Sequence, residues 1–133
     1  MGYIQHKADE SLEDYLETIL ILENQLGQVR SIDIANHMNY SKPSVSVAMK
    51  NLREKAFITV SENGFITLTD KGRSRAENVL ERHNILSDWL ISIGVSKETA
   101  MEDACRVEHD LSEESFLAIK KQFTQASNLV GRD

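Results

Sequence analysis

The chain contains one cysteine, one proline and no long apolar run, and these shortages exclude several classes of protein. One cysteine cannot form an internal disulfide, and the first residues lack the apolar stretch of a signal peptide, so we expect a reduced, cytoplasmic protein. No run approaches the roughly 20 apolar residues that a membrane-spanning helix needs, which excludes membrane insertion. With 133 residues and no Pro-rich or Ser-rich linker, the chain has room for one core or two small layers, not for a large multidomain enzyme.

The net charge of −6 argues against a nucleic-acid partner, but the charge is unevenly distributed. Residues 29–75 carry 8 basic and 4 acidic side chains, a local charge of +4, whereas residues 76–133 carry 6 basic and 11 acidic ones. Attraction to phosphate acts through a screened, local field, so the local excess is a better guide to partners than the total. A basic block is therefore followed by an acidic one.

Periodicity predicts three helices in the first half of the chain. An apolar period of 3.6 residues runs over 11–27 and ends at a glycine. A short helical segment over 32–38 follows, with Ser31 as its expected cap. Ser41 is expected to cap the next helix, with Pro43 in the first turn, where proline is tolerated. The last two helices are separated only by a tight turn.

A hairpin pattern follows the helix that Ser41 begins. That helix is amphipathic, and its apolar arc consists of Val45, Ala48, Met49 and Leu52. Residues 57–61 and 65–69 then alternate β-branched or aromatic residues with polar ones around Asn63-Gly64, a strong hairpin signal. Helix, helix and hairpin in this order predict a mainly α fold that begins with a winged helix-turn-helix.

The polar face of the helix after Ser41 is the predicted DNA-reading surface. In a winged helix-turn-helix this helix enters the major groove of double-stranded DNA and the hairpin lies near the backbone. The predicted DNA-binding residues are Lys42, Pro43, Ser44, Ser46, Lys50 and Arg53. The alternative is a winged helix that makes only protein contacts, but the positive stripe, the small hydroxyl side chains and the short wing all fit DNA.

The second half of the chain is helical throughout. A long helix capped by Asp70 is expected to run to about residue 91 or 93 and to end at Gly94, a second helix capped by Ser96 to run through Asp110, and a third to be capped by Ser112. We predict a winged helix-turn-helix domain over residues 1–70 and a helical metal-binding and dimerisation domain over residues 71–133.

Acid, thiol and imidazole side chains on three of these helices together suggest one divalent metal site. Residues three or four apart share a helix face and can converge on one ion. The candidate metal ligands are Asp14, Glu17, His83, Cys105, Glu108 and His109. Asp14 and Glu17 are three residues apart, and Glu108 and His109 lie three and four residues after Cys105. Neither of these spacings is specific to metal sites by itself.

Each candidate ligand also has an ordinary structural explanation. His83 lies in an apolar stripe, where a neutral core histidine is the usual case, and a lone Cys105 is more often a small buried residue. Asp14 and Glu17 lie opposite the apolar stripe of their helix, which normally means solvent. Glu108 shares an arc with apolar neighbours, and a carboxylate there needs a partner or a metal.

Five sequence motifs, in order, resemble the metal-dependent repressors of the diphtheria toxin repressor and manganese transport regulator family. They are Glu-Asp-Tyr-Leu-Glu-Thr-Ile at 13–19, Ser-Lys-Pro-Ser-Val-Ser at 41–46, Leu-Thr-Asp-Lys-Gly at 68–72, Arg-His at 82–83 and Asp-Ala-Cys-Arg-Val-Glu-His-Asp-Leu-Ser at 103–112. The resemblance covers nearly the whole chain. It implies a homodimeric winged-helix repressor of the two-domain type that binds promoter DNA when Mn(II) or Fe(II) is sufficient.

The resemblance also implies a hybrid ligand set. Asp14 and Glu17 match ligands of the manganese branch, whereas Cys105 replaces the glutamate of that branch and agrees with the iron branch. Carboxylates favour Mn(II), and a thiolate favours Fe(II), Co(II) or Zn(II). Ser87 and Met101 stand where the iron branch has further ligands, so we expect one functional metal per subunit.

The hypothesis is that the ion joins the DNA-binding layer to the dimer layer and so holds the dimer in its DNA-binding conformation. Two other functions were weighed. A metal enzyme is disfavoured because the chain shows no substrate-pocket signal, no Gly-rich phosphate loop and no base beyond the ligands. A winged-helix regulator whose DNA binding is independent of metal remains the main alternative.

Overall fold

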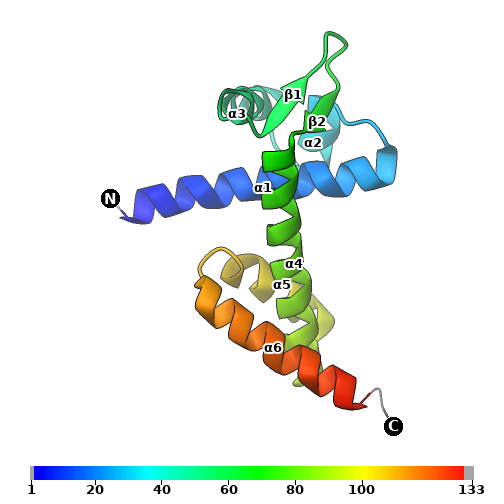
Figure 1. Cartoon of the computed structure of the whole chain (residues 1–133). Coiled ribbons are helices and arrows are strands. Elements are labelled where there is room, and N and C mark those ends of the chain that lie inside the picture. Colours follow the sequence, from blue (N-terminus) through cyan, green and yellow to red (C-terminus); the bar gives the residue numbers. More distant parts are fainter. Residues whose placement is uncertain (1, 131–133) are drawn as a thin grey trace. The chain divides into compact units, whose positions relative to one another are not determined.

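The protein is described by a computed structural model that gives the backbone of residues 2–130 and the side chains of residues 11–125. The elements in chain order are α1 (Gly2–Leu26), α2 (Ser31–Met38), α3 (Lys42–Glu54), β1 (Ile58–Val60), β2 (Ile66–Leu68), α4 (Asp70–Ser92), α5 (Lys97–Val107) and α6 (Glu113–Val130) (Figure 1). The chain divides into two compact units that meet inside α4, between residues 78 and 79. The predicted mainly α fold is confirmed.

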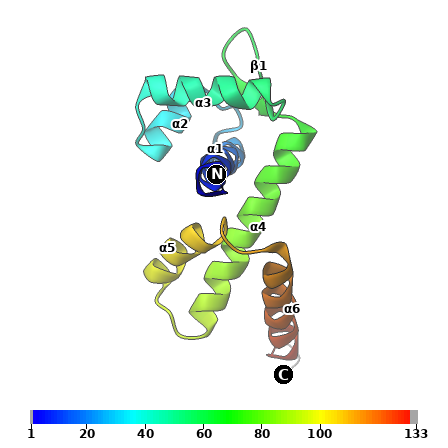
Figure 2. The same ribbon diagram turned by 90° about the vertical axis from the view of Figure 1, so that its left-hand side faces the viewer.

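The N-terminal unit is a winged helix-turn-helix. Helices α2 and α3 pack on each other and on α1, and the antiparallel pair β1–β2 follows α3 (Figures 1 and 2). Fully buried side chains from α1, α2, α3, β1 and the segment before α2 form the core: Leu16, Ile19, Val29, Ile34, Val45, Leu52 and Ile58. The apolar arc predicted for α3 faces this core, because Val45, Met49 and Leu52 are all buried. The other side of α3 is therefore left for a partner.

The turn and hairpin of this unit depend on left-handed backbone. Asn39, between α2 and α3, has φ 59°, a conformation that asparagine tolerates better than most residues. The strands are shorter than expected, and the Ser61 amide donates to the Phe65 carbonyl at 2.9 Å across the loop. Gly64 in that loop has φ +84°, as a glycine at this position of a three-residue hairpin loop does.

Two predicted helix caps are wrong by one residue. Arg30, not Ser31, precedes α2, and its backbone amide donates to the Asp33 carboxylate at 2.9 Å. Thr69, not Asp70, caps α4, because its hydroxyl accepts from the Gly72 amide at 3.1 Å and donates to the Ala56 carbonyl at 2.7 Å. In both cases several adjacent residues are polar, and the hydrogen bond that is formed identifies which of them is the cap. The predicted cap at Ser41 is confirmed, since its hydroxyl accepts from the Ser44 amide at 3.3 Å.

The first turn of α4 is tied closely to the rest of the N-terminal unit. A Cβ on Gly72 would lie 2.0 Å from the Phe57 carbonyl oxygen, so only glycine fits there. Arg73 pairs with Glu23 at 2.6 Å and Arg75 with Glu13 at 3.0 Å, both acids being on α1. The glycine of the Leu-Thr-Asp-Lys-Gly motif is thereby explained by a close approach of backbones.

The C-terminal unit contains the second half of α4 with α5 and α6 on two sides of it (Figure 2). Leu86, Ala100, Ala104 and Phe116 are buried in its core, and Lys120 on α6 pairs with Glu81 on α4. Gly94, with φ +109°, follows the end of α4 as expected. Ser96 and Ser112 accept from the amides of Thr99 and Ser115, which confirms both predicted caps. Among the described residues, the helices lack the combination of length and hydropathy that a bilayer span requires.

Candidate metal centre and DNA-binding face

Helix α3 presents its polar side to solvent in the form expected of a DNA-reading helix. All six predicted DNA-binding residues are exposed: Lys42, Pro43, Ser44, Ser46, Lys50 and Arg53. They lie opposite the buried arc that holds α3 on the core. Lysine and serine side chains on an exposed helix face can contact phosphates and base edges.

A shallow hollow lies beside this face. It has a volume of about 270 Å³ and is lined by Ser31 and Ile32 at the start of α2 and by Lys42 and Ser46 on α3. The N-terminus of a helix favours anions in general. With Lys42 beside it, this hollow is suited to a phosphate group of a nucleic-acid backbone.

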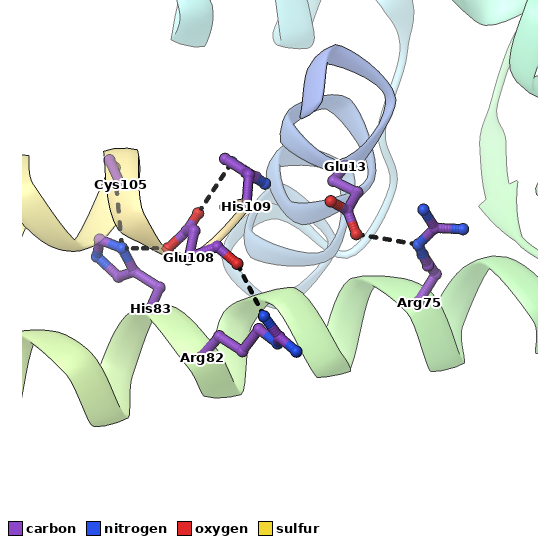
Figure 3. Close-up of polar contacts among 7 residues, drawn as sticks. All are labelled: Glu13, Arg75, Arg82, His83, Cys105, Glu108 and His109. Carbon is purple, nitrogen blue, oxygen red and sulfur yellow. Dashed lines mark hydrogen bonds and ion pairs between the residues drawn. The ribbon is translucent and has the colours of Figure 1, made fainter. Parts of the chain in front are cut away.

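The candidate metal centre is built around a buried carboxylate. Glu108 caps the end of α5 and is 3% exposed. Its Oε2 lies 2.9 Å from His83 Nδ1 on α4, while its Oε1 lies 3.3 Å from His109 Nε2 (Figure 3). Among the described residues Oε1 has no hydrogen-bond partner. A buried carboxylate oxygen without a hydrogen bond is costly unless it is paired with a charge or coordinates a metal.

Cys105 and His83 complete a group of three ligand types. The Cys105 sulfur lies 3.8 Å from His83 Nδ1, and ligand atoms of His83, Cys105 and Glu108 all lie within 4.8 Å of one another (Figure 3). Ligands bound 2.0–2.3 Å from one ion stand roughly 3–4 Å apart, so a small contraction would bring these three onto a metal. Sulfur, nitrogen and oxygen donors together suit a first-row transition ion.

The imidazole of His83 is strongly perturbed by this group. Hydrogen bonds to Cys105 and to Glu108 raise the pKa of His83 from its ordinary 6.5 to about 10, against an opposing effect of burial. In the metal-free protein His83 therefore carries a proton at neutral pH and neutralises the buried carboxylate. A metal ion must displace that proton, because only neutral imidazole can be a ligand.

The six predicted metal ligands are divided between the two units. His83, Cys105, Glu108 and His109 belong to the C-terminal unit, and the contacts above bring them together. Asp14 and Glu17 lie on α1 in the N-terminal unit. Their part in a metal site stays a prediction.

One expectation about this site was wrong. We predicted a helix through Asp110, but α5 ends at Val107, so Glu108 is its cap and His109 lies in the following turn. In this turn the Arg82 guanidinium of α4 donates to the carbonyl of Glu108 (Figure 3) and to that of Leu111. The sequence did not reveal these contacts of Arg82, which was noted only as part of the Arg-His motif at 82–83. Its only signal was its position beside His83.

The fold and the site define a class: a winged-helix DNA-binding protein with a metal centre in a helical second unit. Family models agree, with residues 7–64 matching the N-terminal DNA-binding domain of iron-dependent repressors and residues 69–127 matching their metal-binding and dimerisation domain. The chain belongs to the iron-dependent repressor family. It is a metal-dependent transcriptional repressor that binds DNA and forms a homodimer, as the resemblance implied.

Individual relatives carry the same kind of name. The transcriptional regulator MntR of Salmonella typhimurium is 35% identical over 116 residues, which are 85% of this chain and 74% of the relative. Among solved structures, IdeR of T. acidophilum is 29% identical with a TM-score of 0.73, and a manganese-dependent transcriptional repressor in complex with manganese is 25% identical with a TM-score of 0.76. Each match covers 84% of this chain, which spans about half the length of those solved chains, 53% and 51%.

These matches bear on the two other functions that were weighed. The family is one of transcriptional regulators. A winged-helix regulator whose DNA binding is independent of metal is not favoured, because the second half of the chain matches a metal-binding domain.

Proposed function

We propose that this protein represses genes of Mn(II) or Fe(II) homeostasis in the cytoplasm, and that the metal holds its dimer in the DNA-binding conformation. The observation that carries the proposal is the buried Glu108 carboxylate, which stands with His83 and Cys105 in one cluster of ligand atoms. In this proposal residues 1–70 read DNA and residues 71–133 bind metal and dimerise.

The ligands would be His83, Cys105, Glu108 and His109 of the C-terminal unit, with Asp14 and Glu17 contributed by α1. The first four are supported by their contacts with one another, and the last two by the motif at 13–19 that resembles the manganese branch. The bound ion would supply the positive charge that carboxylates on different helices need in order to share one site. Without it, the repulsion among these carboxylates would be unopposed.

We propose one functional ion per subunit. A second site of the kind that the iron branch has would need ligands at positions 87 and 101, and Ser87 instead donates its hydroxyl to the Asn84 carbonyl at 3.2 Å, while Met101 is 44% exposed. The thiolate of Cys105 would make the site more favourable to Fe(II), Co(II) or Zn(II) than a set of carboxylates alone. The relatives named for manganese support Mn(II) as the competing physiological ion.

DNA would be contacted by the exposed face of α3. Lys42, at the first helical position, would meet phosphate beside the hollow at the start of α2, and Ser44 and Ser46 would face base edges. Lys50 and Arg53 lie one and two turns further on and extend the same positive face. A homodimer would place two such helices in neighbouring major grooves.

The test compares the metal response of ligand variants with that of an exposed acid. Glu108→Ala and His109→Ala should abolish metal-dependent DNA binding and leave a folded dimer. Glu102→Ala, which removes an exposed acid from the same helix as Cys105, should bind DNA like the wild type. DNA affinity is measured by fluorescence anisotropy with Mn(II), Fe(II) or chelator, and dimerisation by sedimentation. An unchanged metal response in both ligand variants would remove these residues from the proposal.

A further inference from the structure

Arg82 donates its hydrogen bonds to main-chain carbonyl oxygens beside the candidate metal centre. Its Nη1 lies 3.1 Å from the Glu108 carbonyl oxygen and 2.7 Å from the Leu111 carbonyl oxygen. Its guanidinium carbon lies 5.0 Å from the ring centroid of Phe116, which is buried in the first turn of α6. One half-buried side chain of α4 therefore reaches the end of α5, the turn after it and the start of α6.

The turn between α5 and α6 needs such a donor. The amides of Asp110 and Leu111 both donate to the Val107 carbonyl at 3.0 Å, so the chain turns tightly directly after α5. The last carbonyls of a helix have no partner within the helix and must find one elsewhere. Arginine suits this task, since it remains protonated and presents several donors in one rigid plane.

Consecutive residues of α4 thus hold both ends of Glu108. Arg82 binds its backbone carbonyl, and His83 binds its carboxylate at 2.9 Å (Figure 3). The carboxylate can stand in one place only if the backbone that bears it is fixed. Since α5 has already ended at Val107, no helical hydrogen bond of α5 fixes the Glu108 carbonyl, and the Arg82 contact takes that part.

We propose that Arg82 is a positioning residue of the metal centre. By holding the carbonyls of Glu108 and Leu111, it fixes the places of the Glu108 carboxylate and of the neighbouring His109 before an ion binds. It is not itself a ligand. This inference rests on the proposed function, because it assigns Arg82 to the same metal site.

Cobalt(II) is the probe for the test, because its visible bands report ligand geometry and its thiolate charge-transfer band reports Cys105. The full-length wild type, Arg82→Ala, Arg82→Lys and Arg106→Ala are titrated anaerobically with Co(II) against a competing chelator. Arg106 is the matched control. It directly follows Cys105 in the sequence, but its side chain is 77% exposed, and its Nη1 lies 3.8 Å from Asp103 Oδ1. Folding of each metal-free variant is checked by circular dichroism.

Arg82→Ala should bind Co(II) about 10- to 100-fold more weakly, the usual loss when a residue that orients a ligand is removed, and with shifted ligand-field bands. Arg82→Lys, which keeps a charged donor but not the planar fork, should recover part of both. Arg106→Ala should match the wild type in affinity and spectrum. A purely structural role would lower the folded fraction without moving the bands of the folded protein.

The outcomes separate this inference from the function on which it rests. If a folded Arg82→Ala keeps the affinity and spectrum of the wild type, the positioning role is overturned and the metal-dependent repressor stands. If Arg82→Ala does not fold, Arg82→Lys decides in the same way, and wild-type behaviour there overturns the role. If the wild type itself binds no Co(II) saturably, the proposed metal centre fails and the role of Arg82 fails with it.

Discussion

Raising the pH of the metal-free protein should remove the stability that the protonated His83 contributes. Its pKa is about 10 in the folded protein, where Cys105 and Glu108 accept its hydrogen bonds, and 6.5 is its ordinary value. A group whose pKa is raised by folding stabilises the folded state fully below its unfolded pKa and loses that effect as the pH rises through the folded pKa. The stabilisation from His83 is therefore lost between about pH 6.5 and about pH 10.

The size of the effect follows from the same two pKa values. Integration of proton binding gives about 4 kcal/mol at about pH 7 and about 1 kcal/mol at about pH 9.5, so about 3 kcal/mol is lost over this interval. The side chain of His83 is only 13% exposed, so solvent screening does not remove the effect.

The assay is urea unfolding in chelator at several pH values, with wild type and His83→Gln compared at each. Glutamine can still donate to the Glu108 carboxylate but has no proton to lose, so other titrating groups largely cancel in the difference. The difference in unfolding free energy between wild type and variant should fall by about 3 kcal/mol from about pH 7 to about pH 9.5. A difference that does not change with pH would refute the assignment of the proton to His83.

Three further predictions concern the backbone, the metal preference and the DNA contact. Gly72→Ala should lower the unfolding free energy by about 1–3 kcal/mol or more in urea titrations, because its Cβ would lie 2.0 Å from the Phe57 carbonyl oxygen. Cys105→Glu should shift the preference of the site towards Mn(II) and away from Co(II) in competition titrations, since a carboxylate replaces the thiolate; an unchanged order of affinities would remove Cys105 from the site. Lys50→Ala should weaken DNA binding and reduce the slope of log affinity against log salt by about 1 if Lys50 meets phosphate, whereas an unchanged slope would place it elsewhere.

Local chemistry made the DNA-binding half predictable. Ser41 caps α3 by a side-chain bond to a residue three positions on, and the apolar arc of α3 is set by residues in one short segment. Such signals involve only neighbours in sequence, so periodicity and capping rules find them. The predicted caps of α2 and α4 were wrong by one residue, because adjacent residues there all have polar groups that could cap the helix.

The details of the metal centre could not be predicted in the same way, because they depend on contacts between distant residues. The candidate residues His83 and Glu108 were recognised, but the end of α5 before Glu108 and the hydrogen bond from Arg82, 26 residues earlier, to the Glu108 carbonyl were not predicted. The reason for Gly72 is likewise the Phe57 carbonyl, which lies between α3 and β1. Neither contact leaves a periodic trace in the sequence.

The central claim is that metal controls DNA binding, and anaerobic selection of genomic DNA fragments on the purified full chain tests it most directly. Mn(II), Fe(II), Zn(II) and chelator are compared in parallel. The account predicts that discrete fragments are retained with Mn(II) or Fe(II) and released by chelator. Equal retention in chelator would contradict it, and would leave a winged-helix regulator that binds DNA without a metal switch.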